Sequence, residues 1–191
     1  ATEFGRKILA ESRRLLTLIE DIIRLSRLDE GVRGEVTPVD LTALIQHCVQ
    51  KLTPAAQNAQ VSISASGNDP VLISGDHALL EEMLTNLLEN GIKYNHAGGY
   101  VRARAEMADG HAVMTVADNG VGIAPEDQQR VFERFYRVDK SRSKQTGGTG
   151  LGLSIVKHGA QVHHAQIAMQ SALGEGTTIT LTFPAQSSGK K

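Results

Sequence analysis

The sequence predicts a two-layer α/β sandwich, a mixed sheet with helices on one face, preceded by one long helix. Three observations lead to this fold class. Most strand-like segments alternate apolar and polar residues, which indicates one covered face and one face open to water. Amphipathic helices with broad aliphatic faces separate those segments, in an order that does not fit a doubly wound parallel sheet. The length of 191 residues suits one domain with an extra element.

Residues 1–30 are predicted to form a helix whose apolar face is too wide for a two-stranded coiled coil. The apolar positions are Ile8, Leu15, Leu16, Leu18, Ile19, Ile22, Ile23 and Leu25. A helix of this kind needs several neighbours, as in a four-helix bundle, and this chain offers too few. We expect it to pack on a second copy or on sequence outside this chain. The alternative is that the helix docks on its own domain. In either case we expect a short linker over residues 31–35.

From residue 36 to residue 185 we expect strand, helix, two strands, helix, two strands, a long polar segment, helix and two strands. Asp40 and Asp76 are the predicted N-caps of the first two helices of this domain. Pro54 is expected to kink the first helix or to end it nearby. Asp109 and Gly110 indicate a hairpin turn. The remaining predictions are a lid at about 120–150 and a disordered tail at 186–191.

Composition and charge exclude several classes of protein. The formal net charge of −1 and the pI of about 6.7 argue against a nucleic-acid binder, and 4% aromatic residues with no Trp argue against stacking platforms. The single cysteine, Cys48, permits neither an intramolecular disulfide nor a Cys-rich zinc site. No apolar run approaches the length of a membrane span, so we expect no direct membrane contact from this chain.

Three polar residues share one face of the helix predicted after Asp76. Asn86, Asn90 and Lys93 stand at i, i+4 and i+7, on the side opposite the leucines. Asn is a poor helix former, so two of them on one face need a reason. Their carbonyl oxygens are hard ligands suited to Mg²⁺, and Lys93 could meet a phosphate. The alternative is an ordinary solvated helix face.

Glycine-rich segments follow one strand and begin one helix. In the segment 118–122, the carboxylate of Asp118 could accept a hydrogen bond from an adenine amino group. The glycines that follow it would let a ligand approach the backbone. The alternatives are a plain turn and a calcium-binding loop, which have similar sequences. The segment 147–153 runs into a helix whose first N–H groups favour anions. It matches neither a P-loop nor a Rossmann turn, and its alternative is a flexible hinge. The segment 174–178 is by itself an ordinary hairpin turn.

In this order and spacing, these motifs resemble the ATP-binding catalytic region of bacterial sensor histidine kinases, which has the Bergerat fold of GHKL ATPases. The resemblance covers about residues 36–184. It rests on an N box (86–94), an F box (132–137) and three glycine boxes (118–122, 147–153 and 174–177). Residues 18–28 also resemble the second helix of that family's dimerisation and phosphotransfer hairpin. The sequence is most similar to sensors of the phosphate-regulon type.

The resemblance implies a role for each matched residue. Asn86 and Asn90 would hold Mg²⁺ on the nucleotide phosphates, and Asn86, Lys93 and Arg137 would serve catalysis, the last two by contacting phosphates. Asp118 would accept from the adenine amino group. The further nucleotide contacts it implies are Tyr94, Tyr136, Ile92, Ile123, Thr177, Gly120, Gly122, Gly148, Thr149, Gly150, Leu151 and Gly152. Residues 120–150 would close as a lid, with Phe132 and Phe135 packing inside it.

The phosphate acceptor is implied by the resemblance, but none of the 7 His residues has the sequence context of the family's acceptor His. We expect that His on a first hairpin helix outside this chain. The implied partners are the hairpin, a second protomer and a response regulator with an acceptor Asp, in the cytoplasmic part of a membrane-anchored sensor. ATP-hydrolysing relatives place a Glu base where this chain has Asn86, which implies suppressed hydrolysis. The alternatives are a serine-directed relative and a degenerate or non-enzymatic interaction module.

The sequence departs from the family pattern in two places. Gly91 stands where Ala is expected, at a cost of about 1 kcal/mol in helix stability. His163, His164 and Ala165 stand where the family turns with Gly-Gly, so a positive φ there would be strained. Neither departure touches an expected nucleotide contact.

Overall fold

The computed structural model describes residues 34–138 and 149–185, and eight residues near the N-terminus. Those eight are Gly5, Ile8, Leu9, Glu11, Ser12, Leu15, Leu16 and Ile19, and all are helical. The large apolar side chains among them are 53–58% exposed. The helix prediction is therefore confirmed at these positions. The predictions made for residues 20–33, for the central part of the lid and for the tail lie outside the described residues.

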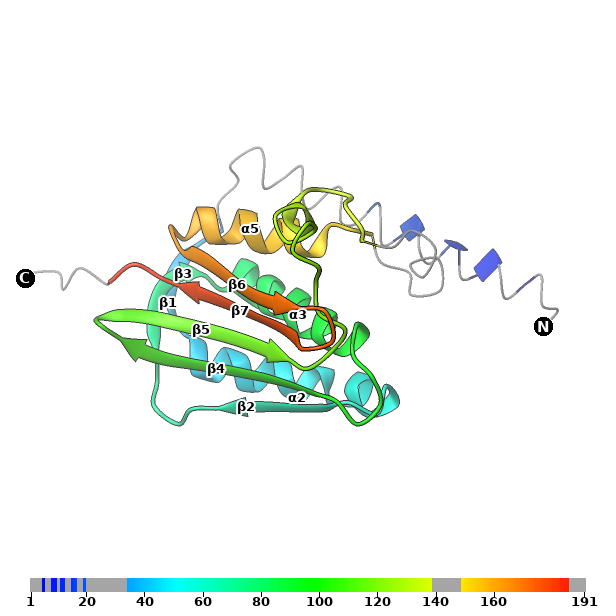
Figure 1. Ribbon diagram of the computed structural model, residues 1–191. Coiled ribbons are helices and arrows are strands. Elements are labelled where there is room, and N and C mark those ends of the chain that lie inside the picture. Colours follow the sequence, from blue (N-terminus) through cyan, green and yellow to red (C-terminus); the bar gives the residue numbers. More distant parts are fainter. Residues whose placement is uncertain are drawn as a thin grey trace, which may run out of the picture.

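A five-stranded mixed sheet forms one layer of the domain, in the order β2-β4-β5-β7-β6 (Figure 1). The strands are β2 (Ser62–Ser66), β4 (Tyr100–Ala108), β5 (His111–Asp118), β6 (Gln166–Ala172) and β7 (Gly176–Thr182). β2 is parallel to β4, and every other neighbouring pair is antiparallel. The second layer, on one face of the sheet, consists of α2 (Leu41–Asn58), α3 (His77–Lys93) and α5 (Gly152–Val162). The predicted two-layer α/β sandwich is thus confirmed.

A separate two-stranded antiparallel sheet, β1 (Val36–Asp40) with β3 (Leu72–Asp76), leads into two of the helices. Each strand ends in an aspartate that caps the helix after it. Asp40 Oδ1 accepts from the backbone N of Thr42 at 2.9 Å, and Asp76 Oδ1 accepts from that of Leu79 at 3.1 Å. Both predicted N-caps are confirmed, and each is worth about 1 kcal/mol.

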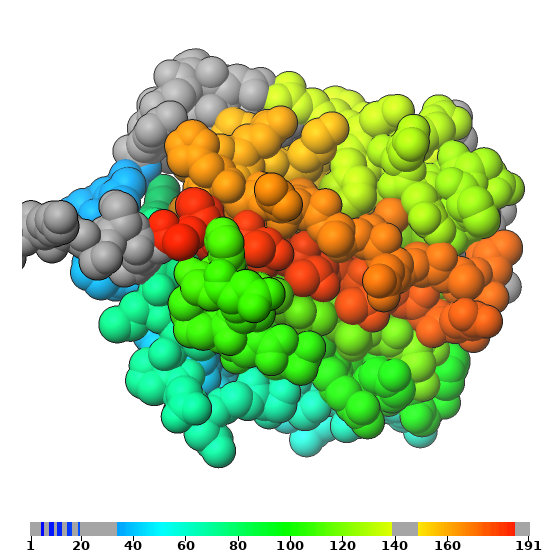
Figure 2. Space-filling model, turned by 60° about the vertical axis from the view of Figure 1, so that its left-hand side comes forward, coloured from blue at the N-terminus to red at the C-terminus, as the bar shows by residue number. Residues whose placement is uncertain are grey.

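The core between the layers is aliphatic, as the low aromatic content indicates. Along β4, Val101 and Ala103 are buried against the helices while Arg102 and Arg104 are exposed on the opposite face. Burying one large aliphatic side chain contributes about 1.5–3 kcal/mol, so this alternation fixes which face the helices cover. Figure 2 shows β6 and β7 beside the β4–β5 hairpin on the surface, with α5 next to β6.

Helix α2 runs through Pro54 and ends at Asn58, four residues later, which agrees with the predicted end near the proline. Leu52 and Ala56, on either side of the proline, are buried in the core at 8% and 0% exposure. Their burial outweighs the cost of about 3 kcal/mol that a proline imposes inside a helix. Packing therefore carries the helix past the proline to its end at Asn58.

The turn predicted at Asp109 and Gly110 joins β4 to β5, and its two residues have φ angles of +49° and +78°. Positive φ at both positions is the geometry that Asp-Gly favours in a tight hairpin. His164, after α5, also has a positive φ of +53°. The strain expected from the missing glycine at that turn is thus present, at about 1–2 kcal/mol.

Candidate functional site

Asp118 is the last residue of β5, and its backbone lies opposite Thr177 of β7. The carboxylate is half-buried, and its Oδ1 accepts from the backbone N of Gly120 at 2.8 Å. Burial raises the pKa of the Asp118 carboxyl, and backbone hydrogen bonds from Gly120 and Thr177 oppose that rise. A carboxylate has about four acceptor positions, so Asp118 can accept a further N–H from a ligand.

Two glycines bring separate backbone segments into contact around Asp118. Gly122 has a φ of +67°, and a Cβ built there would overlap the carbonyl oxygen of Ala172. Gly176 has a φ of +88°, and a Cβ there would overlap the carbonyl oxygen of Asp118. The first and third glycine boxes therefore form one unit, because only glycine permits both approaches.

Ser171 on β6 ties these two glycine boxes together, and sequence reasoning missed it. Its Oγ accepts from the backbone N of Ile123 at 2.8 Å and donates to the carbonyl oxygen of Gly176 at 2.8 Å. Because that proton is used, the Thr177 hydroxyl, 2.9 Å away, is the donor to Ser171. Ser171 could have been found only from the pairing of β6 with β7, which places it opposite Thr177 and which a single sequence does not reveal.

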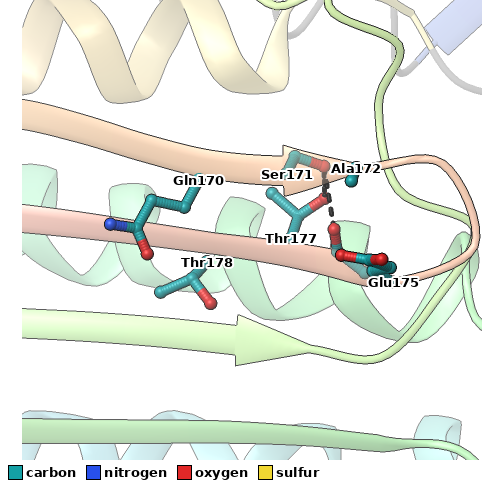
Figure 3. Close-up of a pocket in the computed structure, with 7 residues that line it drawn as sticks. Gln170, Ser171, Ala172, Glu175, Thr177 and Thr178 are labelled. Carbon is teal, nitrogen blue, oxygen red and sulfur yellow. Dashed lines mark hydrogen bonds between the residues drawn. The ribbon is translucent and has the colours of Figure 1, made fainter.

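A cavity of about 310 Å³ lies at the tip of the β6–β7 hairpin, and Figure 3 shows the side chains around it. Its lining consists of Gln170, Ser171, Ala172, Glu175, Gly176, Thr177 and Thr178. Thr177 is the predicted site residue in this set, and Asp118 is not part of the lining. The cavity thus borders the predicted site without containing its carboxylate.

Helix α3 presents Asn86 to the first residue of α5. The Nδ2 of Asn86 donates to the carbonyl oxygen of Glu82 at 3.0 Å, which fixes the orientation of the amide. A Cβ built at Gly152 would lie 2.8 Å from Asn86 Oδ1, so the amide oxygen faces the start of α5. The residue before that helix, Leu151, provides no side-chain cap. The N–H groups at the start of α5 therefore lie next to a hard oxygen donor, where an anion and its cation would both find partners.

A positively charged region lies at the other end of the same helix face. Burial, and then the charge of Arg137, lower the pKa of Lys93, while Glu89 opposes that effect. Lys93 Nζ also lies 5.2 Å from the ring centre of Tyr94. An anionic ligand near Lys93 would favour its charged form and offset the repulsion from Arg137.

The base of the predicted lid connects to the second glycine box. The backbone N of Phe135 donates to the carbonyl oxygen of Gly150 at 2.9 Å, and Phe135 has a φ of +63° with its side chain 55% exposed. Tyr136 donates its hydroxyl proton to Asp127 Oδ1, and the guanidinium of Arg130 lies 4.2 Å from the Tyr136 ring centre. Tyr136 is thus engaged inside the lid base, and its predicted place beside a nucleotide stays a prediction.

Gly91 links α3 to the end of β5. A Cβ built there would lie 3.0 Å from both Val101 methyl groups and 3.5 Å from the Asp118 Cβ. Close packing against Val101 therefore favours glycine at this position. The same contacts show that Asp118 lies beside α3. Ile92 is buried and Ile123 is half-buried. Of the nucleotide contacts predicted in the glycine boxes, Gly148 lies outside the described residues, and Leu151 is fully buried.

In the described ranges, no group of three or more His, Cys, Asp or Glu side chains could hold a metal ion. The oxygen donor that faces the start of α5, Asn86 Oδ1, belongs to an amide, which suits a cation that shares its coordination with phosphates. Within the same part of the chain, no helix has both the length and the hydropathy needed to cross a bilayer.

Comparison with protein families and curated proteins gave matches over most of the chain. Residues 75–187 match the family model described as histidine kinase-, DNA gyrase B- and HSP90-like ATPase. The sensor-like histidine kinase SenX3 of Mycolicibacterium smegmatis is 42% identical over 182 residues, which are 95% of this chain and 47% of that protein. The phosphate regulon sensor protein PhoR of Pseudomonas aeruginosa is 38% identical over 91% of this chain and 40% of its own length. The chain spans about half the length of these relatives or less.

Solved structures share the fold. Full-length ShkA in complex with AMPPNP superposes with a TM-score of 0.80 at 28% identity, over 96% of this chain and 39% of that one. The mycobacterial sensor histidine kinase MprB superposes with a TM-score of 0.66 at 30% identity, over 78% of this chain and 97% of that one.

Proposed function

The chain belongs to the histidine kinase-, DNA gyrase B- and HSP90-like ATPase family, and from that membership we propose a specific role for it. It is the Mg²⁺-ATP-binding catalytic domain of a sensor histidine kinase. The γ-phosphate passes to a His on the dimerisation hairpin of the parent protein, and then to an Asp of a response regulator. The parent is a homodimer that holds this domain in the cytoplasm and is anchored in the membrane.

One juxtaposition supports ATP as the ligand more than any other. Three elements far apart in sequence are neighbours here: Asp118 at the end of β5 lies beside Gly91 of α3, and Asn86 of α3 faces the uncapped start of α5. A single carboxylate acceptor suits the adenine amino group. Backbone N–H groups at a helix start, together with Lys93, suit a triphosphate.

In this proposal, different residues contact different parts of the nucleotide. Asp118 accepts from adenine, Lys93 and Arg137 contact phosphate oxygens, and the backbone of residues 149–152 surrounds the phosphates. Asn86 and Asn90 hold Mg²⁺ through their amide oxygens, a role that fits the Asn86 amide because its Nδ2 is already bonded to the helix backbone. When bound, Mg²⁺ supplies charge neutralisation on the phosphates.

Asn86 also argues for transfer to a protein instead of hydrolysis. An amide cannot accept a proton from water in the pH range of proteins, so this position offers no general base. Glu89, the neighbour of Asn90, projects about 100° away from it on the helix. The domain therefore positions ATP for an incoming imidazole and leaves water unactivated.

Calorimetric titration with a non-hydrolysable ATP analogue, with and without Mg²⁺, tests the binding step. Saturable binding that Mg²⁺ strengthens is the expected result, and absence of binding would instead favour a non-enzymatic interaction module. The transfer step is tested by adding a hairpin that carries the acceptor His. We expect an acid-labile phosphoprotein, whereas an acid-stable one would indicate a serine-directed relative.

Lys93→Met is expected to weaken binding of the ATP analogue about tenfold, because it removes one charge-assisted contact to phosphate. The apo protein should unfold at the same or a higher temperature, because burial and Arg137 already disfavour the charge of Lys93. Calorimetry and thermal unfolding measure the two effects. A large loss of apo stability would contradict the prediction.

The same depressed pKa predicts proton uptake when the nucleotide binds. Phosphate next to Lys93 favours its charged form, so the bound protein takes up protons near the upper end of the usable pH range. Titrations in buffers of different ionisation enthalpy report that uptake. Lys93→Met should abolish it.

A further inference from the structure

His163, which follows the last residue of α5, is buried at 9% exposure and has both ring nitrogens hydrogen-bonded. Its Nε2 lies 3.0 Å from the backbone N of Asp76, and its Nδ1 lies 2.7 Å from the carbonyl oxygen of Gly159. A backbone N–H can only donate, so Nε2 is the acceptor and the proton of the neutral ring is on Nδ1. The imidazole thus joins the end of α5 to Asp76, the N-cap residue of α3.

Asp76 is the point at which several elements meet. Its Oδ1 caps α3, and its Oδ2 accepts from the backbone N of Gly34 at 3.0 Å. The residue before it, Gly75, has no side chain where the ring lies, and a Cβ there would be 2.9 Å from His163 Nε2. The ring therefore fits closely against the backbone of residues 75 and 76.

Helices α3 and α5 are antiparallel and touch at three levels. At one end His163 contacts Asp76, in the middle Gly159 lies against Met83, and at the other end Gly152 lies against Asn86. α5 is about 16 Å long at 1.5 Å per residue, so a shift at its C-terminal end moves its start relative to Asn86. That start and Asn86 form the phosphate side of the candidate site.

We propose that His163 is a positioning residue for nucleotide binding, acting through its bond to the backbone of Asp76. This bond holds α5 at the angle that places the N–H groups at its start next to Asn86. The inference rests on the proposed function, since the site that it positions is the ATP site. His163 itself does not touch the nucleotide.

Two substitutions at this position separate the two bonds. His163→Gln retains an acceptor near the place of Nε2 and loses the donor to Gly159. His163→Asn retains a donor near the place of Nδ1 and loses the acceptor for Asp76. Both lose the edge-on ring contact with Phe183, at 6.3 Å between ring centres, so they are matched in that respect. We expect Gln to bind the ATP analogue within about twofold of the wild type, and Asn about tenfold more weakly.

Asp40→Ala serves as the control for a loss of stability alone. Asp40 caps α2 as Asp76 caps α3, but α2 carries none of the candidate site residues. The thermal midpoint of Asp40→Ala should fall while its affinity for the analogue stays at the wild-type value. Equal affinities for the Gln and Asn variants, or an affinity that simply follows the thermal midpoint across all three variants, would overturn the inference. Failure of the wild type to bind would instead refute the proposed function.

Discussion

Asp118→Asn is expected to weaken binding of the ATP analogue about 100-fold, the largest loss we expect from a single side chain. The carboxylate accepts from the adenine amino group, and a hydrogen bond to a charged acceptor is worth about 1.5–3 kcal/mol. Asn can still accept from the backbone N of Gly120, which holds one carboxylate oxygen at 2.8 Å. Calorimetry on both proteins measures the loss.

The stability of this variant should move in the opposite direction. Burial raises the pKa of the Asp118 carboxyl, so the folded state binds a proton that the unfolded state has released. The wild type therefore loses free energy of unfolding as the pH rises through the titration range of this carboxyl, and Asp118→Asn escapes that loss. Denaturant unfolding at several pH values tests the sign. A variant that is unstable at neutral pH would contradict it.

An inosine nucleotide gives the matched ligand control, because it has a carbonyl group where ATP has the amino group. The wild type should bind it far more weakly than the adenine analogue, since two acceptors then face each other. In Asp118→Asn this preference should largely disappear. A preference that is unchanged in the variant would show that Asp118 does not read the base.

The fold was predictable wherever the signal is local. Alternation along β4 and the caps at Asp40 and Asp76 depend on neighbours within a few residues. The caps are confirmed, and the alternation is confirmed as far as Ala105, whereas Met107, which that alternation predicts to face inward, is 56% exposed.

The end predicted near Pro54 agrees with the end of α2 at Asn58. The turn of helix beyond the proline, however, depends on burial of Leu52 and Ala56 against distant parts of the chain, which the sequence does not show. Local propensity is a weak guide where packing opposes it.

For the candidate site, too, the local features were predictable and the long-range contacts were not. Its motifs were visible as residue types in a fixed spacing, but the contacts that hold them were not. His163 bonds to a residue 87 positions away, and Ser171 bonds to Ile123 across 48 positions. The sequence indicates only that Gly91 lowers helix stability, whereas the structure shows that the side chain of Val101 occupies the space beside it. Each of these depends on which elements become neighbours, and that is set by the whole fold.

Gly176→Ala is expected to lower the free energy of unfolding by about 3 kcal/mol and to weaken nucleotide binding strongly. A side chain at its φ of +88° costs about 1–2 kcal/mol in any surroundings. The new Cβ would also overlap the carbonyl oxygen of Asp118 and lie 2.6 Å from Asn119 Cα. Both atoms are backbone, so relief requires that β5 and β7 separate where Asp118 is held, which adds about 1–3 kcal/mol.

Gly174→Ala is the matched control, two residues earlier in the same hairpin. Gly174 has a φ of +81°, and a Cβ built there meets nothing within 4 Å. It should therefore cost only the backbone term of about 1–2 kcal/mol and leave nucleotide affinity unchanged. Chemical denaturation and calorimetry on the two variants separate backbone strain from displacement of Asp118. If both variants lost the same stability and kept the same affinity, the close approach of the two glycine boxes would have no part in shaping the site.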